Sequence, residues 1–323
     1  MEKLLLLLIL LIISISLCTQ FQQEGTNNSF PETNRSTTYP QQNQTQQNQS
    51  TISLTSQPKT VQQPPSCCSH PYYHSVWRAT SNDGKNWIKE GRLLIDHASV
   101  PHPTQLANGS IVVYYVNGSI DTFDCSITDD GVNYRYGDCK LFNYTTQKAW
   151  DPYVIKLDNG KYRLFFFGPE QGDPGQLPPF PPSNKIYSAL SNDGINFFQE
   201  SGVRFQETGI TDPAVIFVNG TWKMYSAKGS NVVVATSTDS YSFTKVGEYN
   251  TRGSVPDILK FDDGSLLLFI CRNGISYITP PEISGSVESA TVAISGEPNT
   301  IICDPGITRL NDENYVMYYK KQK

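Results

Sequence analysis

One segment in the middle of the chain reads Asp151-Pro152-Tyr153-Val154-Ile155-Lys156-Leu157-Asp158-Asn159-Gly160-Lys161-Tyr162-Arg163-Leu164-Phe165-Phe166. Val, Ile, Tyr and Phe favour strands, and Asn-Gly between two such runs is the strongest short-range signal of a β-hairpin. The segment therefore predicts two antiparallel strands, the first of which begins at an Asp-Pro corner.

The same pattern occurs five times, so the segment is a structural repeat. Each copy places Asp or Val before Pro, then an apolar strand, an Asn- or Asp-rich turn and a second strand. The copies begin at Val100-Pro101, Asp151-Pro152, Asp212-Pro213, Val255-Pro256 and Asp304-Pro305. The prolines are 51, 61, 43 and 49 residues apart, which suits one four-stranded propeller blade per repeat. An insertion at 168–184 accounts for the longest spacing.

A second repeat, a strand–turn–strand motif around Ser-x-Asp-Gly, falls between these hairpins and predicts the outer strands of each blade. Its copies are Ala79–Trp87, Ser126–Tyr134, Ala189–Phe197 and Ala235–Phe243, and we expect a fifth near Ser284-Gly285-Ser286. The series of repeats starts with an outer hairpin that has no inner partner, at Tyr72–Glu90, and it ends with an inner hairpin that has no outer partner. Joining the two closes a ring without exposed sheet edges, which predicts an all-β, five-bladed propeller rather than an open array of hairpins.

The sequence ahead of the repeats differs in composition. Residues 1–18 have a charged start and an apolar run, typical of a secretory signal peptide or membrane anchor. Cleavage near Ser14 or Ser16, an uncleaved anchor and lipid attachment at Cys18 are the alternatives. Residues 19–66 are rich in Gln, Asn, Ser, Thr and Pro and predict a disordered stalk before a propeller at 67–323. We therefore expect an extracellular or cell-surface protein that contacts a membrane only if its N-terminal anchor stays uncleaved.

Charge and cysteine content narrow the possible partners and stabilising bonds. A net charge of −5 argues against a nucleic-acid partner, and nothing in the sequence indicates a cofactor or a metal. Seven cysteines in an exported chain predict disulfides. Cys125 and Cys139 flank one turn symmetrically, which predicts a disulfide between them. Cys271 and Cys303 both come to the end of the propeller where the inner strands begin, so we expect them to form a second disulfide. Cys67 and Cys68 stay unassigned. Within the domain, N-glycosylation sequons occur at Asn108, Asn117, Asn143 and Asn219.

The starts of the five inner strands converge on the central channel and form the candidate site. Asp151, Asp212 and Asp304 hold equivalent positions, and His102 and Asp257 follow two residues later in their repeats. Crowded carboxylates have separated pKa values, which lets one act as acid and another as base. We expect five residues on this face to contact a substrate, namely His102, Tyr153, Asp257, Arg272 and Asp304. The structural alternative is that an Asp before Pro merely caps a turn.

Asp151–Phe166, followed by the outer turn Ser191–Phe197, resembles the arabinanase, levansucrase and invertase superfamily of five-bladed propellers. The resemblance implies three acidic residues around the channel, of which Asp151 and Asp212 match by position and Glu207 is the candidate acid. The first inner strand departs from the pattern, with Val100-Pro101-His102 at the place of the base. The resemblance implies a glycoside hydrolase acting on polysaccharide or oligosaccharide. The alternatives are a non-catalytic carbohydrate-binding propeller and a protein-interaction propeller.

Overall fold

The computed structural model describes residues 70–137, 139–146, 148–168, 184–280, 285–287, 289–311 and 314–322. The expected signal segment, the stalk, Cys67, Cys68 and residues 169–183 of the insertion lie outside these ranges. Among the described residues, no helix has the length and apolar character needed to cross a membrane.

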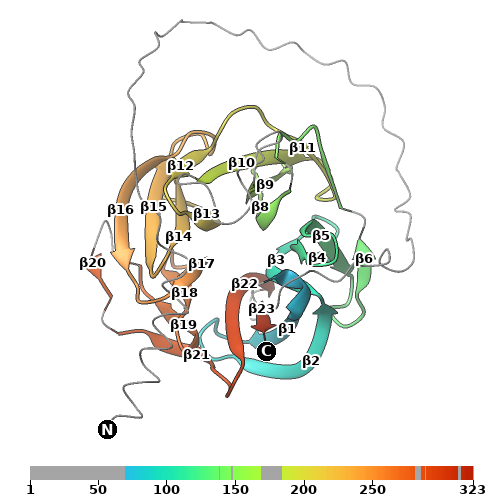
Figure 1. The fold of residues 1–323 in the computed structure, drawn as a ribbon, viewed down its shortest axis with the longest axis vertical. Coiled ribbons are helices and arrows are strands. Elements are labelled where there is room, and N and C mark those ends of the chain that lie inside the picture. Colours follow the sequence, from blue (N-terminus) through green and yellow to red (C-terminus); the bar gives the residue numbers. More distant parts are fainter. Residues whose placement is uncertain are drawn as a thin grey trace, which may run out of the picture. The chain divides into compact units, whose positions relative to one another are not determined.

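The described chain forms five mainly antiparallel sheets arranged around a common axis (Figure 1). A short 3-10 helix, η1 (Pro71–Tyr73), precedes them. Blade one consists of β3 (Ala98–Gln105), β4 (Ile111–Asn117), β5 (Thr122–Thr128) and β6 (Arg135–Gly137). Blade two consists of β8 (Trp150–Lys156), β9 (Tyr162–Phe167), β10 (Asn184–Ser191) and β11 (Asn196–Gln199), with β7 (Lys140–Phe142) and β12 (Phe205–Glu207) added to it. Blade three consists of β13 (Thr211–Val218), β14 (Thr221–Lys228), β15 (Asn231–Ser237) and β16 (Thr244–Asn250), with β20 (Gly285–Ser286) at its edge.

The last two blades complete the ring. Blade four consists of β17 (Ser254–Lys260), β18 (Leu266–Cys271), β19 (Gly274–Ile278) and β21 (Thr291–Ser295). Blade five takes β22 (Ile301–Asn311) and β23 (Asn314–Gln322) from the C-terminal end and β1 (His74–Ser81) and β2 (Ile88–Asp96) from the N-terminal end. β1 pairs with β23 in continuous register from His74–Gln322 to Ser81–Tyr315. The predicted propeller and its closure by a shared blade are both confirmed.

The five innermost strands contact one another in a closed cycle. β3 contacts β22 and β8, β8 contacts β13, β13 contacts β17, and β17 contacts β22. Apolar side chains fill the spaces between neighbouring blades. One cluster, for example, packs Val112 and Tyr114 of blade one with Leu164 and Phe166 of blade two. Because each sheet is covered on both faces, the second strands β4 and β9 are buried along almost their whole length.

Every inner strand begins with a strained corner. The residue before each proline has a positive φ, between 49° and 53°, in Val100, Asp151, Asp212, Val255 and Asp304. A β-bulge interrupts the pairing with the second strand at the same point in all five blades. A residue before proline normally prefers extended backbone, and a β-branched residue such as Val at positive φ is an outlier. The packed ring therefore imposes this conformation on all five corners.

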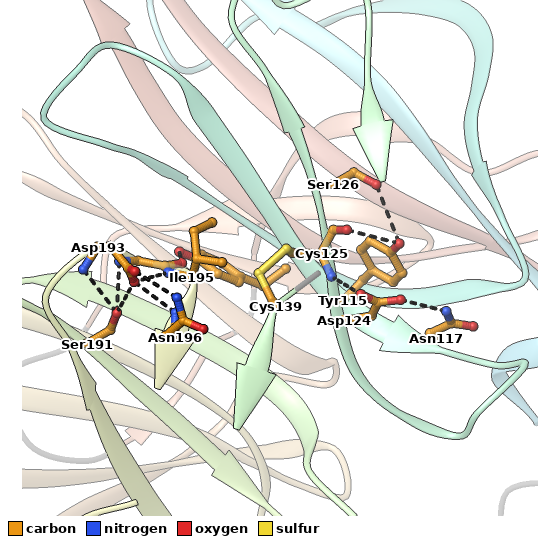
Figure 2. Close-up of a disulfide and its surroundings, with 12 residues drawn as sticks. Tyr115, Asn117, Asp124, Cys125, Ser126, Cys139, Ser191, Asp193, Ile195 and Asn196 are labelled. Atoms are coloured by element: carbon orange, nitrogen blue, oxygen red, sulfur yellow. Dashed lines mark hydrogen bonds between the residues drawn. A yellow bond between two sulfur atoms is a disulfide. The ribbon is translucent and has the colours of Figure 1, made fainter. Parts of the chain in front are cut away.

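The aspartates of the outer turns have a structural role. Asp193 accepts hydrogen bonds from the backbone N–H groups of Ile195 and Asn196 at 2.8 Å and from the Ser191 hydroxyl at 2.8 Å (Figure 2). Asp83, Asp130 and Asp239 accept equivalent bonds in their own turns. The expected fifth copy differs. Gly285–Ser286 pairs in parallel with β16 of blade three instead of forming such a turn, and Ser284 lies outside the described residues.

Two disulfides confirm the predicted pairings. Cys125 bonds Cys139 with a Cα separation of 5.7 Å, and Cys271 bonds Cys303 with a Cα separation of 5.0 Å. Figure 2 shows the first disulfide between blade one and the Ser191–Asn196 turn of blade two. Directly after Cys139, the chain leaves blade one, and its next strand, β7, pairs in parallel with β11 of blade two. The disulfide therefore anchors the point at which the chain crosses between blades.

Candidate functional site

The inner strands bring two layers of side chains to the propeller axis. The corner layer holds the residue before each proline, namely Val100, Asp151, Asp212, Val255 and Asp304. The axis layer holds the residue after each proline, namely His102, Tyr153, Ala214, Asp257 and Gly306. The bulge and the positive φ at each corner separate these layers. The predicted site residues, which the sequence grouped as one cluster, therefore divide between two environments.

The axis layer is closed by its own hydrogen bonds. The Tyr153 hydroxyl donates to Oδ1 of Asp257 at 3.1 Å, and the Tyr153 ring lies 3.8 Å from the His102 ring between centroids. His102 Nε2 lies 2.9 Å from the carbonyl oxygen of Val154 in the next blade. Asp257 also accepts from the backbone N–H groups of Ile258 and Ile307. His102, Tyr153 and Asp257 are thus 6%, 9% and 1% exposed, which leaves them little surface for a substrate.

Two small residues complete the axis layer. A Cβ on Gly306 would lie 1.9 Å from the carbonyl oxygen of Pro101, so blades five and one approach too closely for any side chain there. Ala214 occupies the equivalent position in blade three. Small residues in two blades therefore leave space for the large side chains of the other three.

The corner layer groups three carboxylates from three blades. Oδ2 of Asp151 accepts a hydrogen bond from the backbone N–H of Asp212 at 3.2 Å. The Thr211 hydroxyl donates to Oδ2 of Asp212 at 2.6 Å. Asp151 and Asp212 keep part of their surface exposed, whereas Asp304 is 2% exposed. The structure therefore brings together the three aspartates that the sequence placed at equivalent positions.

Asp304 is held by groups that the sequence did not reveal. Lys320 Nζ lies 2.9 Å from Oδ2 of Asp304, and the Ser99 hydroxyl donates to the same oxygen at 3.1 Å. The backbone N–H of Val100 donates to it at 3.3 Å, and His74 Nδ1 lies 2.9 Å from the Ser99 hydroxyl. Lys320 faces Cys303 across the β22–β23 ladder, which brings its ammonium to the corner. The one sequence signal is that Lys320 follows an apolar run in the last strand.

Crowding and burial set the protonation of these groups. Burial, followed by the like charges of Asp212 and Asp304, raises the pKa of Asp151 well above its ordinary value. Burial and the charge of Asp304 raise the pKa of Asp212 to about 6. In the axis layer, burial raises the pKa of Asp257 to about 7 and lowers the pKa of His102 to about 4. The Asp151 and Asp212 carboxyl groups therefore bind protons more tightly than isolated aspartates do.

The structure places the other two predicted residues in different surroundings. Glu207 pairs with Lys228 at 2.9 Å and with Lys245 at 3.0 Å. Hydrogen bonds from these lysines lower the pKa of Glu207, and the ionised form is the wrong one for a general acid. The Arg272 guanidinium donates to the backbone carbonyls of Thr251 and Val287, at 3.3 and 3.4 Å. Neither residue makes a hydrogen bond with a corner-layer carboxylate among the described contacts.

One group of metal-ligating residue types lies beside the corner layer. A ligand atom from each of Cys271, Cys303 and Asp304 falls within 4.8 Å of the others. Because the two sulfurs are bonded to each other, they offer no thiolate to a metal ion. In the oxidised protein this group is therefore not a metal site.

The fold and the corner layer together define a class: a five-bladed β-propeller with a carboxylate cluster at one end of its axis. No protein-family model matches the sequence, and no curated protein matches it. Solved structures do match the fold. An α-L-arabinanase from Cellvibrio cellulosa, solved with arabinohexaose, is 12% identical with a TM-score of 0.51, over 68% of this chain and 86% of the arabinanase. A Dyadobacter fermentans protein of unknown function is 14% identical with a TM-score of 0.51, over 76% of this chain and 83% of that protein. The resemblance to arabinanase-like propellers is thus confirmed for the fold.

Proposed function

We propose that the protein binds extracellular carbohydrate at the corner layer and hydrolyses a glycosidic bond there. The observation that supports this most is the grouping of Asp151, Asp212 and Asp304 from three blades. Glycoside hydrolysis needs one carboxyl group that donates a proton to the leaving oxygen and a second, ionised carboxylate on the other side of the bond. A cluster of like charges, one of them ion-paired, is an arrangement that can divide these roles.

The three carboxyl groups differ in ways that suggest individual roles. Asp151, whose pKa is raised well above its ordinary value by burial and by two like charges, has the environment of the proton donor. Asp304, ion-paired with Lys320, has the environment of the ionised carboxylate. Asp212 lies beside both and would hold a sugar hydroxyl or an attacking water. In this proposal, Asp151 takes the acid role that the family resemblance had suggested for Glu207.

A second candidate function is carbohydrate binding without turnover. The pairing of Glu207 with two lysines favours it, because the residue predicted as the acid is engaged elsewhere. Carboxylates bind sugar hydroxyls whether or not catalysis follows. The two functions share the corner layer and differ only in whether a bond is broken.

One experiment separates the two functions. Purified protein is incubated at pH 5 to 7 with arabinan, xylan and galactan oligosaccharides, and released sugars are measured beside binding of the same compounds. Release that disappears in Asp151→Asn establishes hydrolysis. Binding without release establishes the binding module. If the protein neither binds nor cleaves any compound of the panel, the result counts against both functions.

We also propose that the protein is exported and carries N-linked glycans. Two disulfides suit an oxidising compartment, and the N-terminal segment suits export. Among the sequons of the domain, Asn108, Asn143 and Asn219 are exposed. Asn117 is engaged, because its Nδ2 donates to Asp124 at 2.8 Å and its Oδ1 accepts from Ser119 N–H at 2.9 Å.

A further inference from the structure

The Cys271–Cys303 disulfide lies against the corner layer. Cys303 directly precedes Asp304, and the backbone N–H of Asp304 points at Cys271 Sγ at 3.1 Å. Asp304 is also one of the five corners held at positive φ. The disulfide thus contacts the backbone of a site carboxylate at the point where that backbone is strained.

Both cysteines line an open cleft of about 480 Å³ between blades four and five. Asn273, Glu297 and Thr300 line the cleft together with Cys271 and Cys303. Cys271 is half-buried and Cys303 is 8% exposed. In contrast, Cys125 is fully buried within the core between blades one and two. A small thiol can therefore approach the Cys271–Cys303 disulfide through the cleft, whereas the Cys125–Cys139 disulfide is shielded at Cys125.

We propose that the Cys271–Cys303 disulfide positions Asp304 and that its reduction switches the carboxylate site off. The proposal rests on the proposed function for its biological meaning, but its structural part can be tested without any sugar. A dithiol such as dithiothreitol supplies two electrons and two protons: the S–S bond breaks, both cysteines become thiols, and the dithiol becomes a cyclic disulfide. The corner at Asp304 then loses its covalent tie to blade four.

The consequence for the site follows from its charges. Asp304 raises the pKa of both Asp151 and Asp212, and Lys320 opposes it. If Asp304 moves away, the repulsion weakens while the attraction of Lys320 stays. The pKa values of Asp151 and Asp212 should then fall. A disulfide that only stabilised the fold would not shift them.

The test follows the aspartate carboxyl groups by carbon-13 NMR during a pH titration, in oxidised protein and after dithiothreitol treatment. EDTA is present, because Cys271, Cys303 and Asp304 could bind a metal once reduced. The Cys271→Ser/Cys303→Ser variant replaces reduction by substitution, and Cys125→Ser/Cys139→Ser is the matched control. We expect the apparent pKa of Asp151 to fall by at least about 0.5 in the first variant and on reduction, and to stay within about 0.2 in the control.

The outcomes separate this proposal from the proposed function. Superimposable titration curves in the oxidised, reduced and variant proteins, each still folded, would overturn the positioning role. An equal shift in both disulfide variants would also overturn it, because the effect would then be general loosening. If the titration shifts as expected but no glycan is bound, the proposed function fails and the positioning role stands. Where a glycan does bind, its affinity should fall at least about tenfold on reduction and recover on reoxidation.

Discussion

The Tyr153 hydroxyl donates a hydrogen bond to Oδ1 of Asp257 at 3.1 Å, although the two residues belong to the second and fourth blades. The bond therefore crosses the propeller axis. Together with the tilted ring contact between Tyr153 and His102, it ties three blades to one another beside the carboxylates of the corner layer.

Removing this bond should destabilise the ring. In Tyr153→Phe, the buried Asp257 loses a donor, and we expect the free energy of unfolding to fall by about 1–3 kcal/mol. Tyr136→Phe is the matched control, because Tyr136 is 52% exposed, and it should change stability by less than about 0.5 kcal/mol. Urea unfolding measures both. Equal effects in the two variants would mean that the cross-axis bond contributes nothing specific.

Asp257 should make stability depend on pH in an unusual direction. Burial raises its pKa in the folded protein to about 7, so the folded state binds this proton more tightly than the unfolded state does. The stabilisation is present below about pH 4 and is lost as the pH rises towards 7. Compared with Asp257→Asn, the wild-type protein should therefore lose about 2–4 kcal/mol between pH 4 and 7.

His102, whose pKa is lowered, contributes a slope of the opposite sign. Because His102 is present in both proteins, its contribution largely cancels in the difference. Urea titrations at several pH values measure that difference. Parallel stability curves for the wild type and Asp257→Asn would show that the Asp257 carboxyl titrates normally.

The N-terminal outer hairpin should be essential for folding. β1 lies between β23 and β2 in blade five, so deleting Tyr72–Glu90 exposes the edge of β23 and also removes His74. We expect this deletion to abolish cooperative thermal unfolding, whereas deleting residues 19–60 should shift the Tm by less than about 2 °C. Similar melting of the two deletion variants would contradict closure of the ring by the shared blade.

The sequons should differ in occupancy when the protein is produced in a host with N-glycosylation. Asn219 is exposed in a hairpin turn, whereas Asn117 is engaged by Asp124 and is followed by a tightly packed Gly118. A Cβ on Gly118 would lie 2.1 Å from the backbone nitrogen of Tyr72. Peptide mapping should therefore find glycan at Asn219 and none at Asn117. Glycan at Asn117 would show that modification precedes folding of that segment.

The sequence predicted the parts of the fold that are local and repeated. Five blades and the shared closing blade could be predicted from three signals: the Asn-Gly and Asp-Gly turns, the inner and outer hairpins that alternate along the chain, and the spacing of the prolines. Both disulfides followed from hairpin symmetry and blade topology. The fifth outer turn could not be predicted, because its strand pairs with the neighbouring blade through a contact that is distant in sequence.

The sequence was enough to predict which aspartates belong to the site, but not how their side chains are arranged in space. Local preference argues against a left-handed residue before proline, so the corner that separates Asp151 from Tyr153 comes from packing of the whole ring. Lys320 and Ser99 reach Asp304 only through tertiary contacts. Glu207 matched a family position loosely, and its lysine partners come from two other strands.

The most direct test of a carbohydrate site at the corner layer compares Asp151→Asn and Asp212→Asn with the wild type by calorimetric binding and sugar release. Asp158→Asn, in the exposed turn at the other end of β8, is the control. We expect binding or turnover to fall at least about a hundredfold in the two corner variants and to stay unchanged in the control. Their Tm should not fall, because each substitution removes a like charge from the cluster. Unchanged glycan binding and turnover with a lowered Tm would show that these aspartates only shape the corners, and would contradict the site.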